Sequence, residues 1–190
     1  MEARLNESLT KILNNVTKHL GRGCVKYYEY FSYIFDSMLK KTVQYDFASI
    51  CGLFEAIGNV AYALCLEKSN NINDLETKVY QYFESAMKRE SDIVNFLFQI
   101  LIIFARFNQG QNSKYIQIYK SILDPNNWSE ENLSLFSVYV QYMSVFFKLN
   151  PPSLIDDKPS IELILNRLVI LDRYELFYRL LTDILKIADL

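Results

Sequence analysis

Apolar residues recur at helical spacing through almost the entire chain. Between Leu75 and Met87, apolar side chains return every three or four residues and charged or amide side chains fill the positions between them. An amphipathic helix with 3.6 residues per turn produces this spacing, whereas a half-buried strand requires strict alternation. Because no alternating segment is found, the sequence predicts an all-α fold.

The periodic segments and the turn signals between them divide the chain into nine expected helices. They lie at about 3–20, 24–42, 46–67, 74–89, 91–108, 113–124, 129–149, 158–170 and 172–188. The expected stops are Gly21-Arg22-Gly23 and the polar or proline-containing segments 68–73, 108–112, 124–127 and 150–152. Asn73, followed three residues later by Glu76, has the pattern of an N-cap and capping box.

The spacing of these helices indicates a repeat architecture. After the first helix the others form four pairs, whose second members begin about 45, 38 and 43 residues apart, within or near the range of HEAT and armadillo repeats. The sequence therefore predicts an α-α superhelix of four helical hairpins and one leading helix. We expect residues 1–190 to be one HEAT-repeat solenoid fragment with hairpins at about 24–67, 74–108, 113–149 and 158–188.

The second helix of each pair is apolar on most of its circumference and polar along one narrow stripe. A helix enclosed by its partner and by both neighbouring repeats has this pattern, and stacked stripes would form an inner binding surface. For any single stripe residue, a solvated face is the simpler interpretation. The candidate protein-binding residues are Glu55, Asn59, Asn95, Gln99, Arg106, Gln141, Lys148, Arg179 and Asp183. Further stripe positions are Tyr62, Ser134, Ser137, Ser144, Glu175, Thr182 and Lys186.

No motif in the sequence indicates catalysis, a cofactor or a metal. The single histidine, His19, has no cysteine or carboxylate cluster at ligand spacing, and the three cysteines form no Cys-x-x-Cys pair. A net charge of −2 without a basic block argues against a nucleic-acid surface. The most apolar run, 93–107, is shorter than the roughly 20 residues of a membrane span. The only tryptophan, Trp128, is interpreted as a buried plug between repeats, with a partner anchor as the alternative.

Four landmarks between residues 45 and 148 carry a resemblance to a known family. They are Tyr45-Asp46-Phe47 with Phe54-Glu55-Ala56-Ile57; Phe98-Gln99-Ile100-Leu101; the segment Tyr115 to Leu123 with Pro125 and Trp128; and Asn132-Leu133. In order and spacing they resemble the CAS-type (cellular apoptosis susceptibility) exportins of the importin-β superfamily. The sequence departs from that pattern at Ser134 and Leu135, where the family has prolines, and at Val138, near a family arginine.

The resemblance implies a fragment from the C-terminal half of a non-enzymatic nuclear transport receptor. Its parent would bind importin-α together with the GTP form of the GTPase Ran and export importin-α from the nucleus to the cytoplasm. It implies shuttling between these compartments, contact with nuclear pore proteins, and no cofactor, nucleic acid or membrane insertion. It transfers no contact residue, so the stripe residues rest on helical geometry alone.

Two alternatives remain open at this level. The chain could be a HEAT-repeat scaffold or adaptor subunit of another complex, with a resemblance that reflects solenoid similarity alone. It could also be a self-contained helical bundle with an unrecognised active site.

Overall fold

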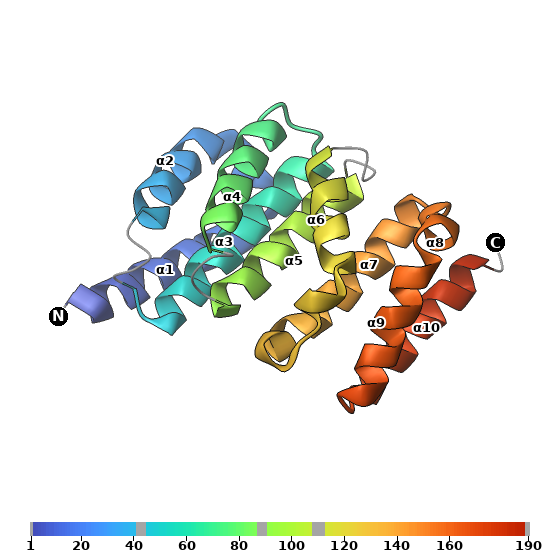
Figure 1. Ribbon diagram of the computed structural model, residues 1–190. Coiled ribbons are helices and arrows are strands. Elements are labelled where there is room, and N and C mark those ends of the chain that lie inside the picture. Colours follow the sequence, from blue (N-terminus) through green and yellow to red (C-terminus); the bar gives the residue numbers. More distant parts are fainter. Residues whose placement is uncertain (1, 41–44, 87–90, 108–112, 189–190) are drawn as a thin grey trace. The chain divides into compact units, whose positions relative to one another are not determined.

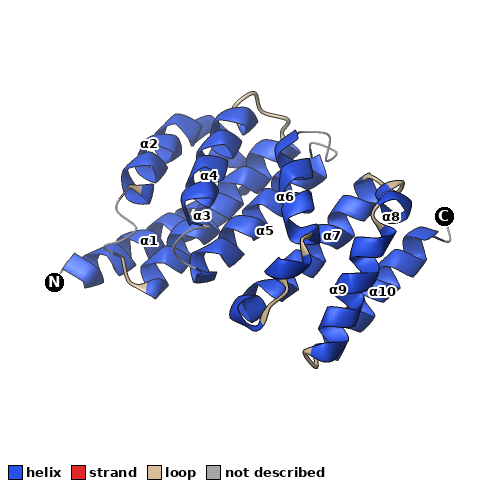
Figure 2. Cartoon of the chain, viewed as in Figure 1, coloured by secondary structure: helices blue, strands red, loops and turns tan. Residues whose placement is uncertain are grey.

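The computed structural model describes residues 2–40, 45–86, 91–107 and 113–188. All regular structure in these ranges is helical (Figure 2), and the predicted all-α fold of paired helices, of the α-solenoid class, is confirmed. The expected turn at 108–112 lies outside the described residues. The chain divides into two compact units, residues 1–104 and 105–190. That residues 1–190 form one solenoid stays a prediction.

The first unit contains two layers of helices (Figure 1). One layer holds α1 (Glu2–Leu20), α3 (Phe47–Leu66) and α5 (Ser91–Phe107), and the other holds α2 (Tyr28–Leu39) and α4 (Ile72–Ala86). Helix α3 contacts α1, α2 and α4, and its Phe54 ring stacks on Phe96 of α5 with centroids 6.3 Å apart. The core of this unit is therefore built around α3.

The burial of α3 explains its unusual composition. It is the one described helix long and apolar enough to cross a membrane by length and composition, and 61% of its most apolar window is buried inside the protein. Leu53, Ile57 and Val60 are completely buried, and Asp46 caps the helix by accepting a 2.8 Å hydrogen bond from the backbone N–H of Ser49. Contacts with neighbouring helices account for its apolar side chains.

The second unit repeats the arrangement of paired helices. It contains α6 (Ser113–Leu123), α7 (Phe136–Leu149), the short α8 (Ser153–Asp156), α9 (Lys158–Ile170) and α10 (Tyr174–Ala188). Helix α10 packs on both α7 and α9, and α6 packs on α7. The Tyr119 ring of α6 stacks on Phe146 of α7 with centroids 3.9 Å apart, while its hydroxyl donates to Asp157 at 3.0 Å.

The structure corrects several predicted helix boundaries. Residues Gly21–Tyr27 form a 3-10 helix, η1, in place of a stop and a helix start, and Glu130–Leu135 form a second, η4, so that α7 begins at Phe136. A short 3-10 helix, η3, spans Pro125–Asn127. The hydrophobic periodicity of 3-10 and α segments differs little over one or two turns, which is why the sequence did not distinguish them.

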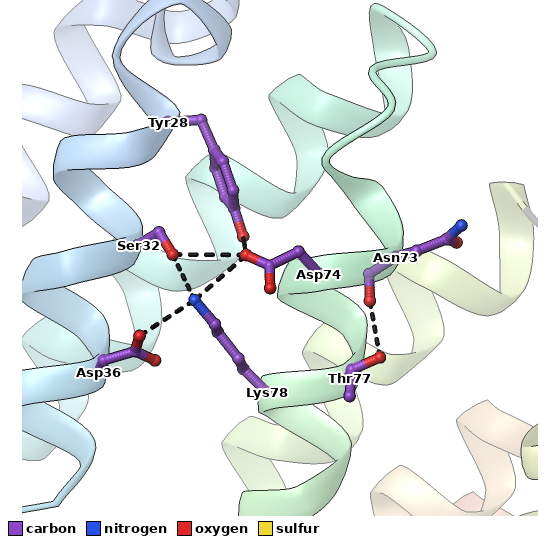
Figure 3. Close-up of polar contacts among 7 residues, drawn as sticks. All are labelled: Tyr28, Ser32, Asp36, Asn73, Asp74, Thr77 and Lys78. Carbon is purple, nitrogen blue, oxygen red and sulfur yellow. Dashed lines mark hydrogen bonds and ion pairs between the residues drawn. The ribbon is translucent and has the colours of Figure 1, made fainter.

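The predicted capping box at Asn73 is wrong. Helix α4 begins one residue earlier, at Ile72, and Asn73 lies in its first turn, where its carbonyl accepts a 2.7 Å hydrogen bond from the Thr77 hydroxyl (Figure 3). Glu76 is only 4% exposed, so its side chain is directed into the protein. The residue types at Asn73 and Glu76 suit a capping box, but a difference of one residue at a helix start removes that role.

Two helices are followed by a residue other than glycine in the left-handed backbone conformation. Helix α3 is followed by Lys68 and α9 by Asp172, with φ of 49° and 55°. In both cases the next N–H returns to the carbonyl five residues earlier, from Ser69 to Leu64 at 3.0 Å and from Arg173 to Leu168 at 2.8 Å. These are Schellman motifs, which satisfy helix-end carbonyls and reverse the chain between adjacent elements.

Helices α1 and α3 approach each other closely at Gly52. A Cβ placed on Gly52 would lie 3.1 Å from the Cβ and hydroxyl oxygen of Thr10 and 3.3 Å from the Thr10 backbone carbonyl carbon. Thr10 is completely buried, and its hydroxyl donates to the Glu7 carbonyl of the same helix at 3.1 Å. This contact is possible because Gly52 of α3 has no side chain and because the Thr10 hydroxyl of α1 makes its hydrogen bond within its own helix.

A polar cluster connects α2 to α4 (Figure 3). Lys78 Nζ lies 3.1 Å from a carboxylate oxygen of Asp36 and 3.1 Å from one of Asp74, and it also donates to the Ser32 hydroxyl. Tyr28 donates to the same Asp74 oxygen at 2.7 Å. Burial opposes charge on Asp74, but hydrogen bonds from Tyr28 and Lys78 outweigh it and hold the pKa of Asp74 below its usual value.

Gly52→Ala and Gly58→Ala form a matched pair that tests the α1–α3 contact. Gly52→Ala should lower the free energy of unfolding by about 1–3 kcal/mol through overpacking against Thr10. A Cβ on Gly58 would lie 3.9 Å from Ile100 Cγ1, an ordinary contact, so Gly58→Ala should raise stability by up to about 1 kcal/mol through helix propensity. Urea denaturation measures both. Equal stability of the two variants would contradict the close approach.

The Asp74 pKa gives a pH-dependent prediction. The pKa of Asp74 is lowered in the folded protein, so its carboxylate stabilises the fold at pH values above the ordinary pKa of 3.8. That contribution is lost as the pH falls through the folded-state pKa. Asp74→Asn should cost about 1 kcal/mol at pH 7, since its half-exposed carboxylate is screened by water. The difference in free energy of unfolding between Asp74→Asn and the unsubstituted protein, measured by urea denaturation, should shrink as the pH falls from 5 to about 3. The exposed control Asp156→Asn should cost less than about 0.5 kcal/mol at pH 7.

Candidate protein-binding surface

Five predicted stripe residues lie on α3 and α5, and the last of them, Arg106, belongs to the second unit. Glu55, Gln99 and Arg106 are exposed, while Asn59 and Asn95 are partly buried. The residues next to Gln99 on α5 point into the core, and Phe98 and Leu101 are each 1% exposed. The polar positions of these helices are therefore the solvent-accessible ones, which a binding surface requires.

Helix α1 contributes to the same surface, a feature that the sequence analysis missed. Asn14 donates a hydrogen bond to a Glu55 carboxylate oxygen. Asn59 in turn donates to the side-chain oxygen of Asn14 at 3.0 Å and to the Thr17 hydroxyl at 3.2 Å. Glu55 and Asn59 are thus held in place by α1, and their side chains are ordered before any partner binds.

Two adjoining hollows lie along α1 and α3, and together we name them the α1–α3 groove. The larger, about 510 Å³, is lined by Asn14, Lys18, Glu55, Gly58, Asn59, Tyr62 and Ile103. The smaller, about 280 Å³, is lined by Thr17, Lys18, Gly21, Arg22, Asn59, Tyr62, Ala63 and Leu66. Lys18, Asn59 and Tyr62 line both, so the hollows form one continuous groove.

The second unit carries the remaining candidate residues. Lys148 and Arg179 are exposed, and Gln141 and Asp183 are partly buried. Lys148 Nζ of α7 lies 3.9 Å from a carboxylate oxygen of Asp183 on α10, so two predicted stripe residues face each other between adjacent helices. The Lys148 side chain is 57% exposed and that of Asp183 only 19%, so the lysine is the member of the pair that is open to a partner.

Ser144 does not belong to the exposed stripe. It is 5% exposed, and its hydroxyl donates to the Val140 carbonyl at 2.9 Å within α7. Ser134 lies on η4, outside the α-helical period that relates the other stripe positions. The sequence analysis placed Ser134 by extending one helix back to residue 129, which the 3-10 segment interrupts, whereas Ser144 has the expected helical spacing within α7 but lies on a buried side of the helix.

Trp128 is a buried packing residue, in agreement with the first interpretation. Its side chain is completely buried, and its indole N–H donates to the Ile122 carbonyl at 2.7 Å. Its ring lies near Phe136 and Tyr139, with centroids at 4.9 and 5.5 Å. Its carbonyl accepts a 3.0 Å hydrogen bond from Arg167 of α9. The tryptophan connects the end of α6 to α7 and α9, and it offers no surface to a partner.

The cysteines and the histidine have ordinary structural surroundings. Among the described residues, Cys24, Cys51 and Cys65 form no disulfide. Burial raises the pKa of Cys24, and burial together with the Glu76 charge raises the pKa of Cys65 to about 12, so both stay protonated at neutral pH. His19 is exposed at the end of α1, with Nδ1 2.8 Å from the Asn15 carbonyl oxygen. In the described part of the chain, no group of three or more His, Cys, Asp or Glu residues could hold a metal ion.

A family model described as "CAS/CSE protein, C-terminus" matches residues 34–165, more than half of the chain. The chain belongs to the CAS/CSE family. The resemblance inferred from the sequence landmarks is confirmed. CAS/CSE proteins are nuclear transport receptors, a class not known for catalysis. No curated protein and no solved structure matches the chain.

Two of the three positions at which this CAS/CSE chain departs from the family pattern are buried. Leu135 and Val138 are each 5% exposed and lie at the junction of η4 and α7. Leucine and valine in place of proline and arginine therefore change the core at this junction. Of the departures, only Ser134 is exposed.

Core and surface residues of α5 provide a test of the surface assignment. Phe98→Ala or Leu101→Ala should lower the free energy of unfolding by roughly 2–5 kcal/mol, because each opens a cavity in the core. Gln99→Ala and Arg106→Ala should each change it by less than about 0.5 kcal/mol. Thermal melts measure all four. A loss at Gln99 or Arg106 as large as that at Phe98 would show that these two side chains are part of the core.

Proposed function

We propose that this chain is part of a nuclear export receptor that binds importin-α together with Ran in its GTP form and returns importin-α to the cytoplasm. The observation that carries the proposal is the CAS/CSE match over residues 34–165. The paired helices of both units are consistent with a solenoid receptor. Movement between nucleus and cytoplasm, and contact with nuclear pore proteins, belong to the same proposal.

The packing within each unit suggests how such a receptor responds to its ligands. In the first unit α1 packs on α3 and α2 packs on α4, so helices that alternate along the sequence are in contact within a layer. Small rotations at such contacts add along a repeat protein and change its curvature. Importin-α and Ran would each stabilise one curvature, and each would then raise the affinity of the other by the same factor.

We further propose that the stripe residues contact the protein partners. Five of these residues are exposed, and Glu55 and Asn59 line the groove beside α1 and α3, which supports this assignment. The proposed contact residues are Glu55, Asn59, Asn95, Gln99, Arg106, Gln141, Lys148, Arg179 and Asp183. Exposed polar residues on an ordered scaffold fit a receptor that must release its partners, because such interfaces gain specificity and fast association more than affinity.

A binding assay with purified partners tests the export function. The protein expressed from its complete reading frame should retain importin-α in the presence of Ran locked in the GTP form and lose it with Ran in the GDP form. A combined Gln99→Ala and Arg106→Ala variant should bind importin-α about 10-fold more weakly with an unchanged melting temperature, since these side chains are exposed. Lys26→Ala, an exposed position on η1, is the matched control.

Failure of the complex would favour a different role. If neither Ran form changes the retention of importin-α, the export proposal is wrong, and the chain is a helical-repeat scaffold or adaptor of another complex. The observation that favours this second candidate is that the chain departs from the family pattern at two buried positions, Leu135 and Val138. Identification of the proteins that co-purify with the tagged chain from its own cells would then name that complex.

A further inference from the structure

The α1–α3 groove has an uneven distribution of charge. Its smaller hollow contains two cationic residues, Lys18 and Arg22, and none of the residues that line it carries a carboxylate. The larger hollow contains one carboxylate, Glu55, which already accepts a hydrogen bond from Asn14, and it shares Lys18. The end of the groove near Gly21 is therefore positive.

The two cations are available to a ligand. Lys18 is exposed on α1, and no ion pair is described for it among residues 2–40, 45–86, 91–107 and 113–188. Arg22 has one partner, Glu67, at 3.5 Å, and the two side chains are 72% and 41% exposed. An exposed pair of this kind contributes little free energy, so an incoming carboxylate can replace Glu67 at small cost.

Apolar surface lies beside these charges. Tyr62 is 53% exposed and lines both hollows, with Leu66 next to it in the smaller one and Ile103 in the larger one. A half-exposed tyrosine between polar side chains is a frequent anchor in protein interfaces. A ligand that fits this groove needs an apolar side chain adjacent to a carboxylate.

We propose that the α1–α3 groove binds an acidic segment of a protein partner, with a carboxylate at Lys18 and Arg22 and an apolar side chain against Tyr62. Charge complementarity selects this occupant. Two cations are too few for a nucleic-acid surface, which commonly makes six to ten phosphate contacts. Lys18 and Arg22 precede the segment matched by the family model, so this inference does not rest on the export function.

Fluorescence polarisation with two labelled synthetic decapeptides tests the proposal on the full chain. One peptide alternates aspartate or glutamate with leucine and phenylalanine, and the other replaces every acid by its amide. The acidic peptide should bind at least about tenfold more tightly, and added salt should weaken its binding, because paired charges are screened. Equal affinity for the two peptides, or no binding of the acidic one below about 1 mM, would overturn the proposal.

Substitutions locate the site. Lys18→Glu and Tyr62→Ala should each weaken the acidic peptide about tenfold or more, whereas Lys26→Glu, a charge reversal on η1 outside the groove, should have little effect. A third peptide, with lysine in place of each acid, should bind Lys18→Glu more tightly than it binds the unsubstituted protein. That gain of binding cannot come from unfolding, and circular dichroism melts check that Lys18→Glu and Tyr62→Ala remain folded.

Two further outcomes would overturn the assignment. If Lys26→Glu weakens the acidic peptide as much as Lys18→Glu does, the attraction is a property of the whole surface and the groove is not the site. If a labelled uridine oligonucleotide binds more tightly than the acidic peptide, and the Lys18→Glu variant loses this binding, the groove is a nucleic-acid site. The importin-α assay is read separately, so failure here leaves the export proposal standing.

Discussion

The first unit depends on the burial of α3 against its neighbours. This helix contacts α1, α2 and α4 and stacks an aromatic ring on α5, and its apolar side chains are covered on nearly every side. The contact with α1 is close because Gly52 has no side chain and Thr10 satisfies its own hydroxyl. That contact also sets the distance between Asn14 and Glu55, so core packing positions the groove.

Polar contacts between helices of the same layer have a different role from the apolar core. The cluster around Lys78 joins α2 to α4, and the Lys148–Asp183 pair joins α7 to α10. Each contains half-exposed charges whose interaction water screens, so they fix relative orientation at low energetic cost. A receptor that changes curvature needs such contacts, because dense apolar packing at every seam resists small rotations.

The helices were predictable because hydrophobic periodicity is a local property. The segments expected at 46–67, 113–124, 158–170 and 172–188 lie within two residues of α3, α6, α9 and α10 at each end. Errors arose at helix starts. Asn73 resembled a cap, but the helix begins at Ile72, and η4 replaced the first turns of the helix expected from 129. The exposed side of α5 could be predicted because it also follows from helical periodicity. The groove could not be predicted, because its walls come from two different helices, α1 and α3.

The sequence by itself determined the all-α fold, the positions of most helices and the CAS/CSE resemblance, because each depends on residue order along one segment. Only the tertiary structure decided which face of α1 packs on α3. Leu9, Ile12 and Val16 are exposed, while Leu13 is buried and Thr10 and Thr17 are completely buried. The close approach at Gly52 favours small residues that hydrogen-bond within their own helix, and this choice brings Asn14 and Lys18 to the groove.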